Sequence, residues 1–314
     1  MSFSSDIKKE LCSVKLKKDH CILAELSGII YLSGTLALGS GGLSIVVNTE
    51  NPDVVRRTLS LAKSTFSIDG ELSLKKGPLK KNDIYVMRFS GREQVLFLLE
   101  RLGLSIDGGV QVSEHRFLEI TAQPCCQAAF IRGAFLGGGV ASDPQKQYQI
   151  EFVTGSPATA SALCDVISRA GFSSKITQRK DSHVVYSKDG ENIINLLTFI
   201  GAHSSVLALE DVRIMKDILN NVNRRLNFDT ANIDRTVTSA SAQTANILLI
   251  AEQIGFDHLP KALRDTAELR LAYPEASLAE LADLSGGTSK SGINHRLRKL
   301  NEIAKGLRET LKEE

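Results

Sequence analysis

The sequence contains no tryptophan, and aromatic residues account for only 5% of its 314 residues. This scarcity argues against the aromatic platforms on which proteins stack single-stranded nucleic acid. A large excess of charge is also missing: the formal net charge is +2, so an affinity for nucleic acid requires basic residues that cluster locally. With 42% hydrophobic and 24% charged residues, the composition is that of an ordinary soluble protein, and the length suggests about two domains.

A metal-binding motif is absent from the spacing of cysteine and histidine. The five cysteines form no CxxC pair, and the adjacent Cys125-Cys126 suits neither a zinc knuckle nor a disulfide bridge. His20 lies beside Cys21, and no metal-ligand spacing is found there or at the isolated histidines His115, His183, His203 and His258. We therefore expect reduced, mostly buried thiols in a cytoplasmic protein, with no metal ion and no cofactor.

One uncharged segment, Leu26–Thr49, is long enough to cross a bilayer. It contains five glycines and many hydroxyl groups, and its second half has the composition of a strand. These features favour a buried helix that leads into a core strand, so we predict no transmembrane segment. The N-terminal residues also lack the apolar core of a signal peptide. They predict an amphipathic helix capped by Ser4 or Ser5, with one apolar side formed by Ile7, Leu11 and Val14.

The first two-thirds of the chain contain an internal repeat. "CILAELSGIIYLSGTL" (residues 21–36) aligns without a gap with "CQAAFIRGAFLGGGVA" (residues 126–141), at an offset of 105, since Gly28 matches Gly133 (133 − 28 = 105). After the first copy we expect a strand at Leu43–Thr49 and a helix opened by Asn51-Pro52. A hairpin with its turn at Gly77-Pro78 and a closing helix at residues 92–104 follow. Those expected after the second copy are Tyr148–Thr154, the helix after Ser156-Pro157, the turn at Lys180–Ser182 and residues 191–202.

The repeat predicts an α+β domain in which two αββαββα units are related by a pseudo-twofold axis. A glycine inside a helix costs roughly 1 kcal/mol relative to alanine, so Gly28 and Gly133 require an explanation. If the two glycine-bearing helices pack against each other about the axis, the missing side chains let their backbones approach closely.

The two glycine-bearing helices resemble the signature helix of the LAGLIDADG homing endonucleases. The resemblance implies that these helices form the domain interface and that the acid before the final glycine binds the catalytic metal. In "SGIIYLSG" that position is Ser33, and in "RGAFLGGG" it is Gly138. Neither side chain offers the hard oxygen ligands that Mg²⁺ requires, so we predict a protein without nuclease activity. Asp143, just beyond the second motif, is left as an alternative acid.

The C-terminal third is expected to be entirely helical. Residues 211–229 predict a basic connecting helix that ends in a break near Asn227–Thr230. The next helix, ended by Gly255, has apolar or small side chains at helical spacing: Ile233, Val237, Ala240, Thr244, Ile247, Ala251 and Ile254.

Residues 277–309 predict a helix-turn-helix. "SLAELADL" is a short helix capped by Ser277, with Glu280 in a capping box. "SGGT" is a tight turn, and Ser289 caps a long second helix. The apolar stripe of that helix is formed by Ile293, Leu297, Leu300, Ala304 and Leu307. No acidic residue occurs between Asp283 and Glu302, so the opposite side of the helix is entirely neutral or basic over this stretch.

The start of this second helix is predicted to contact DNA. Its hydroxyl and backbone N–H groups suit phosphate, Arg298 suits a guanine edge and Asn294 suits adenine. The candidate contact residues are Ser289, Lys290, Ser291, Asn294, His295, Arg296, Arg298 and Lys299. Two alternatives remain open: a basic helix face that is merely solvated, and a helix-turn-helix that docks protein.

Secondary DNA contacts are predicted at Lys75, Lys76, Lys80 and Lys81 in the first hairpin, and at Arg224 and Arg225. A soluble hairpin tip explains the four lysines equally well. Basic residues in the corresponding hairpin of the second copy slightly favour a functional surface: Lys175, Arg179 and Lys180.

The combination of a degenerate LAGLIDADG-like domain with a C-terminal helix-turn-helix resembles the WhiA family. Three segments carry the resemblance, "GAHSSVLALEDVRIMKD", "NRRLNFDTANIDRT" and "SKSGINHRLRKLNEIA". It implies a DNA-binding regulator of Gram-positive bacteria, developmental in sporulating actinobacteria and associated with cell division and chromosome segregation in low-GC relatives. The rival hypotheses are an active endonuclease that uses Asp143 and a protein-docking scaffold.

The predicted organisation follows from these segments. Residues 1–210 form the degenerate LAGLIDADG-like domain, with repeats at about 20–105 and 125–204. Residues 211–229 form the linker helix, and 230–314 form the helical DNA-binding domain. The expected partner is double-stranded DNA, with other transcription or cell-division proteins as further candidates. The expected location is the cytoplasm, at the nucleoid and away from membranes. The LAGLIDADG-like domain would serve as an extra backbone clamp or as a platform for protein partners.

Overall fold

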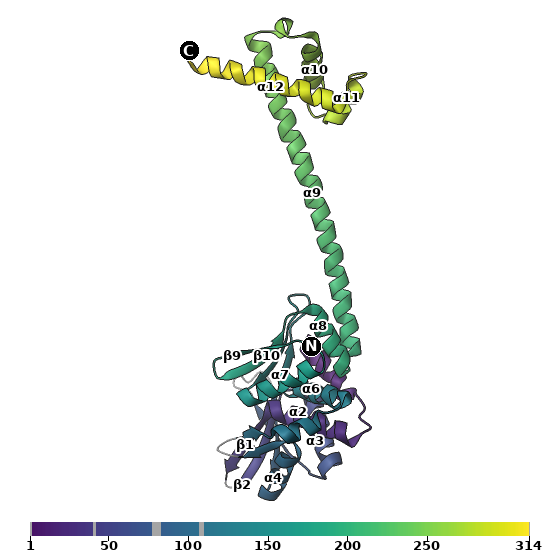
Figure 1. The fold of residues 1–314 in the computed structure, drawn as a ribbon, viewed down its shortest axis with the longest axis vertical. Coiled ribbons are helices and arrows are strands. Elements are labelled where there is room, and N and C mark those ends of the chain that lie inside the picture. The colour runs from purple at the N-terminus through teal and green to yellow at the C-terminus, as the bar shows by residue number, and fades with distance from the viewer. Residues whose placement is uncertain (1, 40–41, 77–82, 107–109, 314) are drawn as a thin grey trace. The chain divides into compact units, whose positions relative to one another are not determined.

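The computed structural model describes residues 2–39, 42–76, 83–106 and 110–313. Two compact units divide the chain, Met1–Lys216 and Asp217–Glu314, and Figure 1 shows their elements along the chain. Each unit has a hydrophobic core of its own.

The first unit contains the predicted repeat. The elements of the first copy are α2 (Asp19–Ser33), β1 (Gly34–Gly39), β2 (Gly42–Thr49), α3 (Pro52–Phe66), β3 (Glu71–Lys76), β4 (Asp83–Ser90) and α4 (Arg92–Arg101). Those of the second are α6 (Pro124–Gly138), β7 (Gly139–Ala141), β8 (Ile150–Thr154), α7 (Pro157–Arg169), β9 (Lys175–Arg179), β10 (Ser182–Ser187) and α8 (Gly190–Ile200). The predicted αββαββα order is therefore confirmed in both copies. The turn expected at Gly77-Pro78 lies outside the described residues.

The two copies form equivalent antiparallel sheets. Their strand orders are β1-β2-β4-β3 and β7-β8-β10-β9, so each strand has its counterpart in the other sheet. One face of each sheet is buried because alternate residues point into the shared core: Ile45, Val47, Met87 and Phe89 in the first sheet, and Ile150, Phe152 and Val185 in the second. The linking segment contributes β5 (Leu104–Ile106), β6 (Val110–Val112) and α5 (Glu114–Ile120).

Helices α2 and α6 pack against each other through their glycines. A Cβ atom added to Gly28 would lie 2.1 Å from the carbonyl oxygen of Phe130. One added to Gly133 would lie 2.0 Å from the carbonyl oxygen of Glu25. Any side chain at either position would therefore force the backbones apart. The close approach predicted from the repeat is confirmed, and it explains why two glycines stand inside helices.

A buried ion network also joins the two copies. The Glu25 side chain is fully buried and accepts from Arg57 Nε and Arg132 Nε, both at 2.6 Å. Arg132 Nη1 donates to the carbonyl oxygen of Ile200 at 2.8 Å, at the end of α8. The carboxylate thus connects α2 to α3 and α6, and Arg132 connects α6 to α8.

The N-terminal helix α1 (Phe3–Ser13) buries Ile7 and Leu11 as predicted. Its predicted cap is wrong: Ser2, not Ser4 or Ser5, accepts from the backbone N–H of Ser5. The prediction failed because three serines stand close together, and the first of them adopts the extended backbone of a cap.

Helix α9 (His203–Gln253) is continuous, so the break predicted near Asn227–Thr230 is wrong. The residues there lower helix propensity by only a few tenths of a kcal/mol each, and the run contains neither glycine nor proline. The apolar stripe predicted beyond the break is buried only in part: Ala240 and Ile247 are buried, whereas Ile233 and Val237 are exposed.

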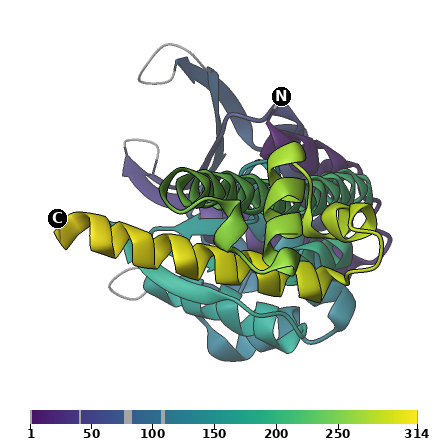
Figure 2. The ribbon, with the colours of Figure 1, turned by 90° about the horizontal axis from the view of Figure 1, so that it is seen from above.

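The second unit is helical. After α9 come a short 3₁₀ turn (Phe256–His258), α10 (Lys261–Ala272), α11 (Leu278–Leu284) and α12 (Lys290–Glu313). Figure 2 shows α12 as the long yellow helix with the shorter helices beside it. Its core combines side chains from all four helices and Leu259, which follows the 3₁₀ turn: Ile247, Ile250, Leu259, Leu263, Ala267, Leu281, Ile293, Leu297, Leu300 and Ala304. The boundary between the two units lies within α9 at Lys216. The sequence predicted a linker helix at residues 211–229, and the predicted domain limits stay a prediction.

Within the described residues, no helix combines the length and the apolar character needed to cross a membrane.

Candidate DNA interface

The helix-turn-helix is formed by α11 and α12. Ser277 and Glu280 form the predicted capping box at the start of α11. The turn that follows needs glycine, because Gly286 has φ +69°, a left-handed conformation that other residues rarely adopt. Ser285 stabilises the turn, since its hydroxyl donates to Ala282 O at 2.7 Å and accepts from the Thr288 backbone N–H at 3.2 Å.

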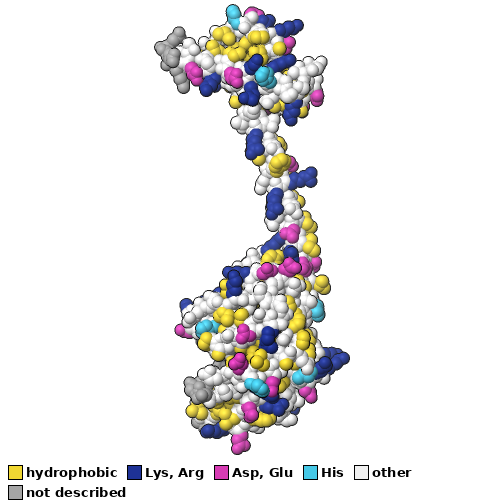
Figure 3. Space-filling model, viewed as in Figure 1, with side chains coloured by type: hydrophobic (Ala, Val, Ile, Leu, Met, Phe, Trp, Pro, Cys, Tyr) yellow, Lys and Arg dark blue, Asp and Glu magenta, His cyan; other side chains and the backbone are white. Residues whose placement is uncertain are grey.

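Helix α12 has one buried face and one exposed face, as its sequence predicts. Ile293, Leu297 and Leu300 are at most 1% exposed and pack into the core of the unit. The opposite face is exposed along its first three turns and carries Ser291, Asn294, His295, Arg298 and Lys299. Arg296 is half-buried between the two faces. Figure 3 shows Lys and Arg side chains on the visible surface of this unit. The side of α12 that bears Arg298 is therefore available to a partner.

The start of α12 presents hydroxyl groups and backbone N–H groups to solvent. Ser289 caps the helix, since its hydroxyl accepts from the Gly292 backbone N–H at 3.2 Å. The hydroxyls of Ser289 and Ser291 lie 2.9 Å apart. Together with Lys290 and Asn294 they line a shallow hollow beside α11. Because the first turn contains no acid, a phosphate there would meet only donors.

A second hollow in this unit brings together basic side chains that spacing alone did not suggest. It is lined by Arg235 of α9, Arg270 of α10 and Lys290 of α12, with Ser277 nearby. Arg270 is only 2% exposed, and its Nη1 donates to Ala276 O at 2.6 Å. Burial lowers the pKa of Arg270 from its usual value. In the sequence Arg270 is one of the two arginines of α10, and nothing in the local pattern distinguishes it from Arg264 as the buried one.

The secondary DNA contacts predicted outside the helix-turn-helix lie on separate elements. Lys75 and Lys76 end the exposed strand β3, and Lys76 pairs with Asp83; Lys80 and Lys81 lie outside the described residues. In the second copy, Arg179 forms two hydrogen bonds with Glu151, which reduce its capacity to bind phosphate. Arg224 and Arg225 are exposed on α9.

The positions of the missing catalytic acids come together at the C-terminal ends of α2 and α6. The Ser33 hydroxyl lies 3.1 Å from the place where a Cβ of Gly137 would stand, and it donates to Ile29 O at 2.7 Å. A Cβ on Gly138 would lie 2.6 Å from Val153 O. A carboxylate at Gly138 would therefore require the backbone to shift.

Asp143 does not take over this position through any contact that the described residues show. Its side chain is exposed and accepts from the Gln145 backbone N–H at 2.9 Å. Its carbonyl oxygen accepts from Lys146 and Gln147, so the residue shapes its own turn.

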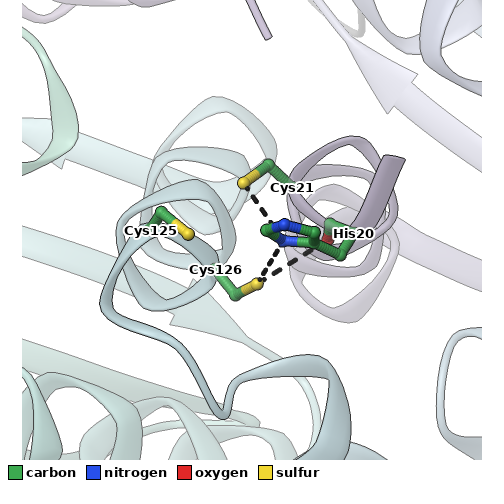
Figure 4. A group of neighbouring side chains, drawn as sticks. All are labelled: His20, Cys21, Cys125 and Cys126. Carbon is green, nitrogen blue, oxygen red and sulfur yellow. Dashed lines mark hydrogen bonds between the residues drawn. The ribbon is translucent and has the colours of Figure 1, made fainter. Parts of the chain in front are cut away.

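The N-terminal ends of α2 and α6 hold a cluster of histidine and cysteine side chains that the spacing of these residues in the sequence did not predict. His20 and Cys21 of α2 meet Cys125 and Cys126 of α6, and their four ligand atoms lie within 4.8 Å of one another (Figure 4). Burial and the neighbouring thiols raise the pKa of Cys21 to about 12. The expectation of mostly buried thiols is wrong, since Cys125 is exposed and Cys12 and Cys164 are half-buried. The repeat offset was the available signal, because it pairs Cys21 with Cys126 and also His20 with Cys125 (125 − 20 = 105).

Fold and site together define a class: a LAGLIDADG-like domain whose catalytic positions lack acids, followed by a helix-turn-helix domain. Three WhiA family domains match the chain: the N-terminal LAGLIDADG-like domain at residues 19–105, the LAGLIDADG-like domain at 127–219 and the C-terminal HTH domain at 222–304. The chain belongs to the WhiA family.

Its relatives match it along almost the whole length. The probable cell division protein WhiA of Clostridium beijerinckii is 47% identical over 98% of this chain and 99% of its own. The protein of the same name from Alkaliphilus metalliredigens is 41% identical over 97% and 98%. Among solved structures, full-length DUF199/WhiA from Thermatoga maritima matches with a TM-score of 0.59 and 26% identity, covering 97% of this chain and 98% of that one.

Proposed function

We propose that this protein is a sequence-specific, non-catalytic DNA-binding regulator of transcription that acts in cell division and chromosome segregation, or in sporulation. The observation that carries the proposal is the exposed face of the first three turns of α12, which contains no acidic residue and lies opposite the buried stripe. The role in cell division rests on the names of the relatives. The protein would act in the cytoplasm at the nucleoid, with double-stranded DNA as its partner and other transcription or cell-division proteins as further partners.

In this mechanism, α12 enters the major groove with its N-terminal turns against the bases. Ser289, Lys290 and Ser291 contact phosphate, while Asn294, His295 and Arg298 reach base edges. Arg296 and Lys299 flank this face and contact the backbone. The hollow lined by Arg235 and Arg270 would receive a neighbouring phosphate.

Secondary contacts are proposed for Lys75, Lys76, Lys80 and Lys81, and for Arg224 and Arg225. These side chains would add phosphate contacts without reading sequence. Through the four lysines the first unit would act as a backbone clamp, with a platform for protein partners as the competing role.

Two measurements test the DNA-binding proposal. A genome-wide map of the protein on DNA in its own cell gives the target sequence, which is then used in an anisotropy titration. We expect Arg298→Ala to weaken specific binding by about 1–3 kcal/mol, because a bidentate contact to guanine is lost. The control is Lys305→Ala, an exposed basic residue two turns further along α12 that pairs with Glu309. Equal affinities of the two variants and the unaltered protein for the target would refute the assignment.

Salt dependence separates this proposal from a protein-docking scaffold. Phosphate contacts release counterions, so affinity for DNA should fall steeply as salt rises. An affinity for the target DNA that does not change with salt concentration would contradict the proposed contacts.

We propose that the protein does not cleave DNA, because Ser33 of α2 and Gly138 of α6 stand where a LAGLIDADG nuclease has its catalytic acids. Gly138 also has no room for a side chain. Incubation of the purified protein with target-bearing plasmid and Mg²⁺ should leave the DNA intact. Nicking that disappears in Asp143→Asn would instead establish the rival endonuclease.

A further inference from the structure

The cluster at the N-terminal ends of α2 and α6 takes its residues from equivalent positions of the two repeats. His20 and Cys21 are the second and third residues of α2, and Cys125 and Cys126 are the second and third residues of α6. Each repeat therefore contributes two potential ligands from the same turn of the same helix. Figure 4 shows the imidazole ring and the sulfur atoms directed toward a common centre.

The distances are close to those of a tetrahedral site. His20 Nδ1 lies 3.0 Å from Cys126 Sγ and 3.4 Å from Cys21 Sγ. All four ligand atoms lie within 4.8 Å of one another. Zinc at about 2.3 Å from sulfur and about 2.0 Å from nitrogen requires separations of roughly 3.5–3.8 Å between its ligands. Small side-chain adjustments therefore complete the site.

We propose that His20, Cys21, Cys125 and Cys126 bind one structural zinc ion. Three thiolates and one imidazole form a closed tetrahedral set that selects a soft or borderline cation over Mg²⁺ or Ca²⁺. The ion is held by Nδ1 of the histidine and by the three Sγ atoms, and each coordinating thiol loses its proton to solvent on binding.

The surroundings favour the charge of such a site. Three thiolates around Zn²⁺ leave a net charge of −1, and the N-terminal ends of two helices converge there. The partial positive charge at each helix start stabilises an anionic centre. Cys21 and Cys126 are buried, whereas Cys125 is exposed and gives the ion a path from solvent.

The zinc would link the two repeats at one end of the α2–α6 interface. At the other end lie Ser33 and Gly138, where a LAGLIDADG nuclease would bind its catalytic metal. The proposed ion is thus structural, remote from the lost active site and independent of the DNA-binding face of α12. A disulfide between Cys21 and Cys126 is the competing state, but it would leave His20 and Cys125 without a role.

Metal analysis of the purified full-length protein tests the proposal. Under reducing conditions and after dialysis against zinc and then buffer, we expect one zinc ion per chain. Replacement of zinc by Co²⁺ should give visible d–d bands of a tetrahedral site and near-ultraviolet charge-transfer absorption from thiolates. Failure to bind zinc in the reduced protein, or a cobalt spectrum without thiolate charge transfer, would overturn the proposal. So would a Cys21–Cys126 disulfide in protein freshly isolated from the cell.

Variants assign the ligands. Cys126→Ser and Cys125→Ser should each lower bound zinc from one ion per chain to well under half after dialysis. The matched control is Cys164→Ser, because Cys164 lies outside the cluster beside Ser174 and should leave the zinc content unchanged. Circular dichroism checks that each variant is folded. Should the buried Cys126→Ser variant fail to fold, the exposed Cys125→Ser variant and the cobalt spectrum still decide the matter. Retention of a full ion by Cys125→Ser would refute the assigned ligand set.

Discussion

At the scale of single residues, the first unit depends on places where a side chain would not fit. Gly28 and Gly133 allow α2 and α6 to approach so closely that an added Cβ would overlap a carbonyl oxygen. A carbonyl in a helix cannot rotate away without breaking its own hydrogen bond, so the strain cannot be relieved locally. The same contact places Glu25 beside Arg132.

We therefore expect Gly133→Ala to destabilise the first unit by about 3 kcal/mol, because the helices must separate and the core between them loosens. Thermal unfolding should show this as a midpoint lowered by roughly 6–12 °C. The control is Gly155→Ala, where an added Cβ meets nothing within 4 Å. It should change the free energy of unfolding by no more than about 0.5 kcal/mol. Equal midpoints for the two variants would contradict the packing argument.

At the scale of elements, the start of α9 is capped by a side chain from a distant helix. Glu10 of α1 accepts from the backbone N–H groups of Ser204 and Ser205, at 2.6 and 2.9 Å, and from the Ser205 hydroxyl at 2.7 Å. Burial alone would raise the pKa of Glu10, but the hydrogen bonds from Ser205 and Ser204 outweigh it and lower the pKa below its usual value.

A group whose pKa is lowered on folding stabilises the protein above its unfolded pKa, and this contribution is lost as the pH falls through the folded pKa. We expect Glu10→Gln to cost about 1–2 kcal/mol near pH 7. The cost should shrink toward zero in acid, where Glu10 is protonated. Urea unfolding of both proteins across this pH range measures the difference.

The same comparison in a Ser205→Ala background supplies the control: only the part of the Glu10 effect that the Ser205 hydroxyl carries should disappear there, because the two backbone N–H groups still donate to the carboxylate. A difference between the two proteins that stays constant from neutral pH into acid would show that the capping carboxylate is not responsible.

The length of α9 illustrates how far local signals determine an element. The Asn, Asp and Thr residues near Asn227–Thr230 are typical of caps, and they predicted a break that the structure does not contain. Such residues act as caps only where the chain turns, and here the backbone continues through them. By contrast, Gly286 does end a helical stretch, because its positive φ belongs to the turn itself.

At the scale of the whole molecule, the chain contains two separate hydrophobic cores. One lies between Met1 and Lys216 and includes α2, α6 and both sheets. The other lies between Asp217 and Glu314 and includes the helix-turn-helix. Because buried apolar area drives cooperative unfolding, each core should unfold as its own cooperative unit.

Calorimetry should therefore resolve two transitions. Leu297→Ala removes a side chain that is 1% exposed in the second core and should lower only one of them, at a cost of about 2–5 kcal/mol. Gly133→Ala should lower only the other. A single transition that both substitutions shift equally would mean that the two cores unfold together.

Much of this architecture can be predicted from the sequence alone. The offset of 105 residues predicted the two αββαββα copies, the helix pair and the close approach at Gly28 and Gly133. The spacing of Ile293, Leu297 and Leu300 predicted the buried side of α12 and thereby its exposed side. These features depend on periodicity and on similarity between segments, both of which are properties of the sequence alone.

Only the tertiary structure decided what those elements bring together. His20 and Cys126 are more than a hundred residues apart in the sequence, and their ligand atoms come together only because α2 and α6 pack against each other. The hollow that brings Arg270 together with Arg235 and the capping of α9 by Glu10 likewise depend on segments that are distant in the sequence. The physical reason is that a sequence pattern records which face of an element is apolar, whereas the neighbours of a polar side chain are fixed by how those faces assemble.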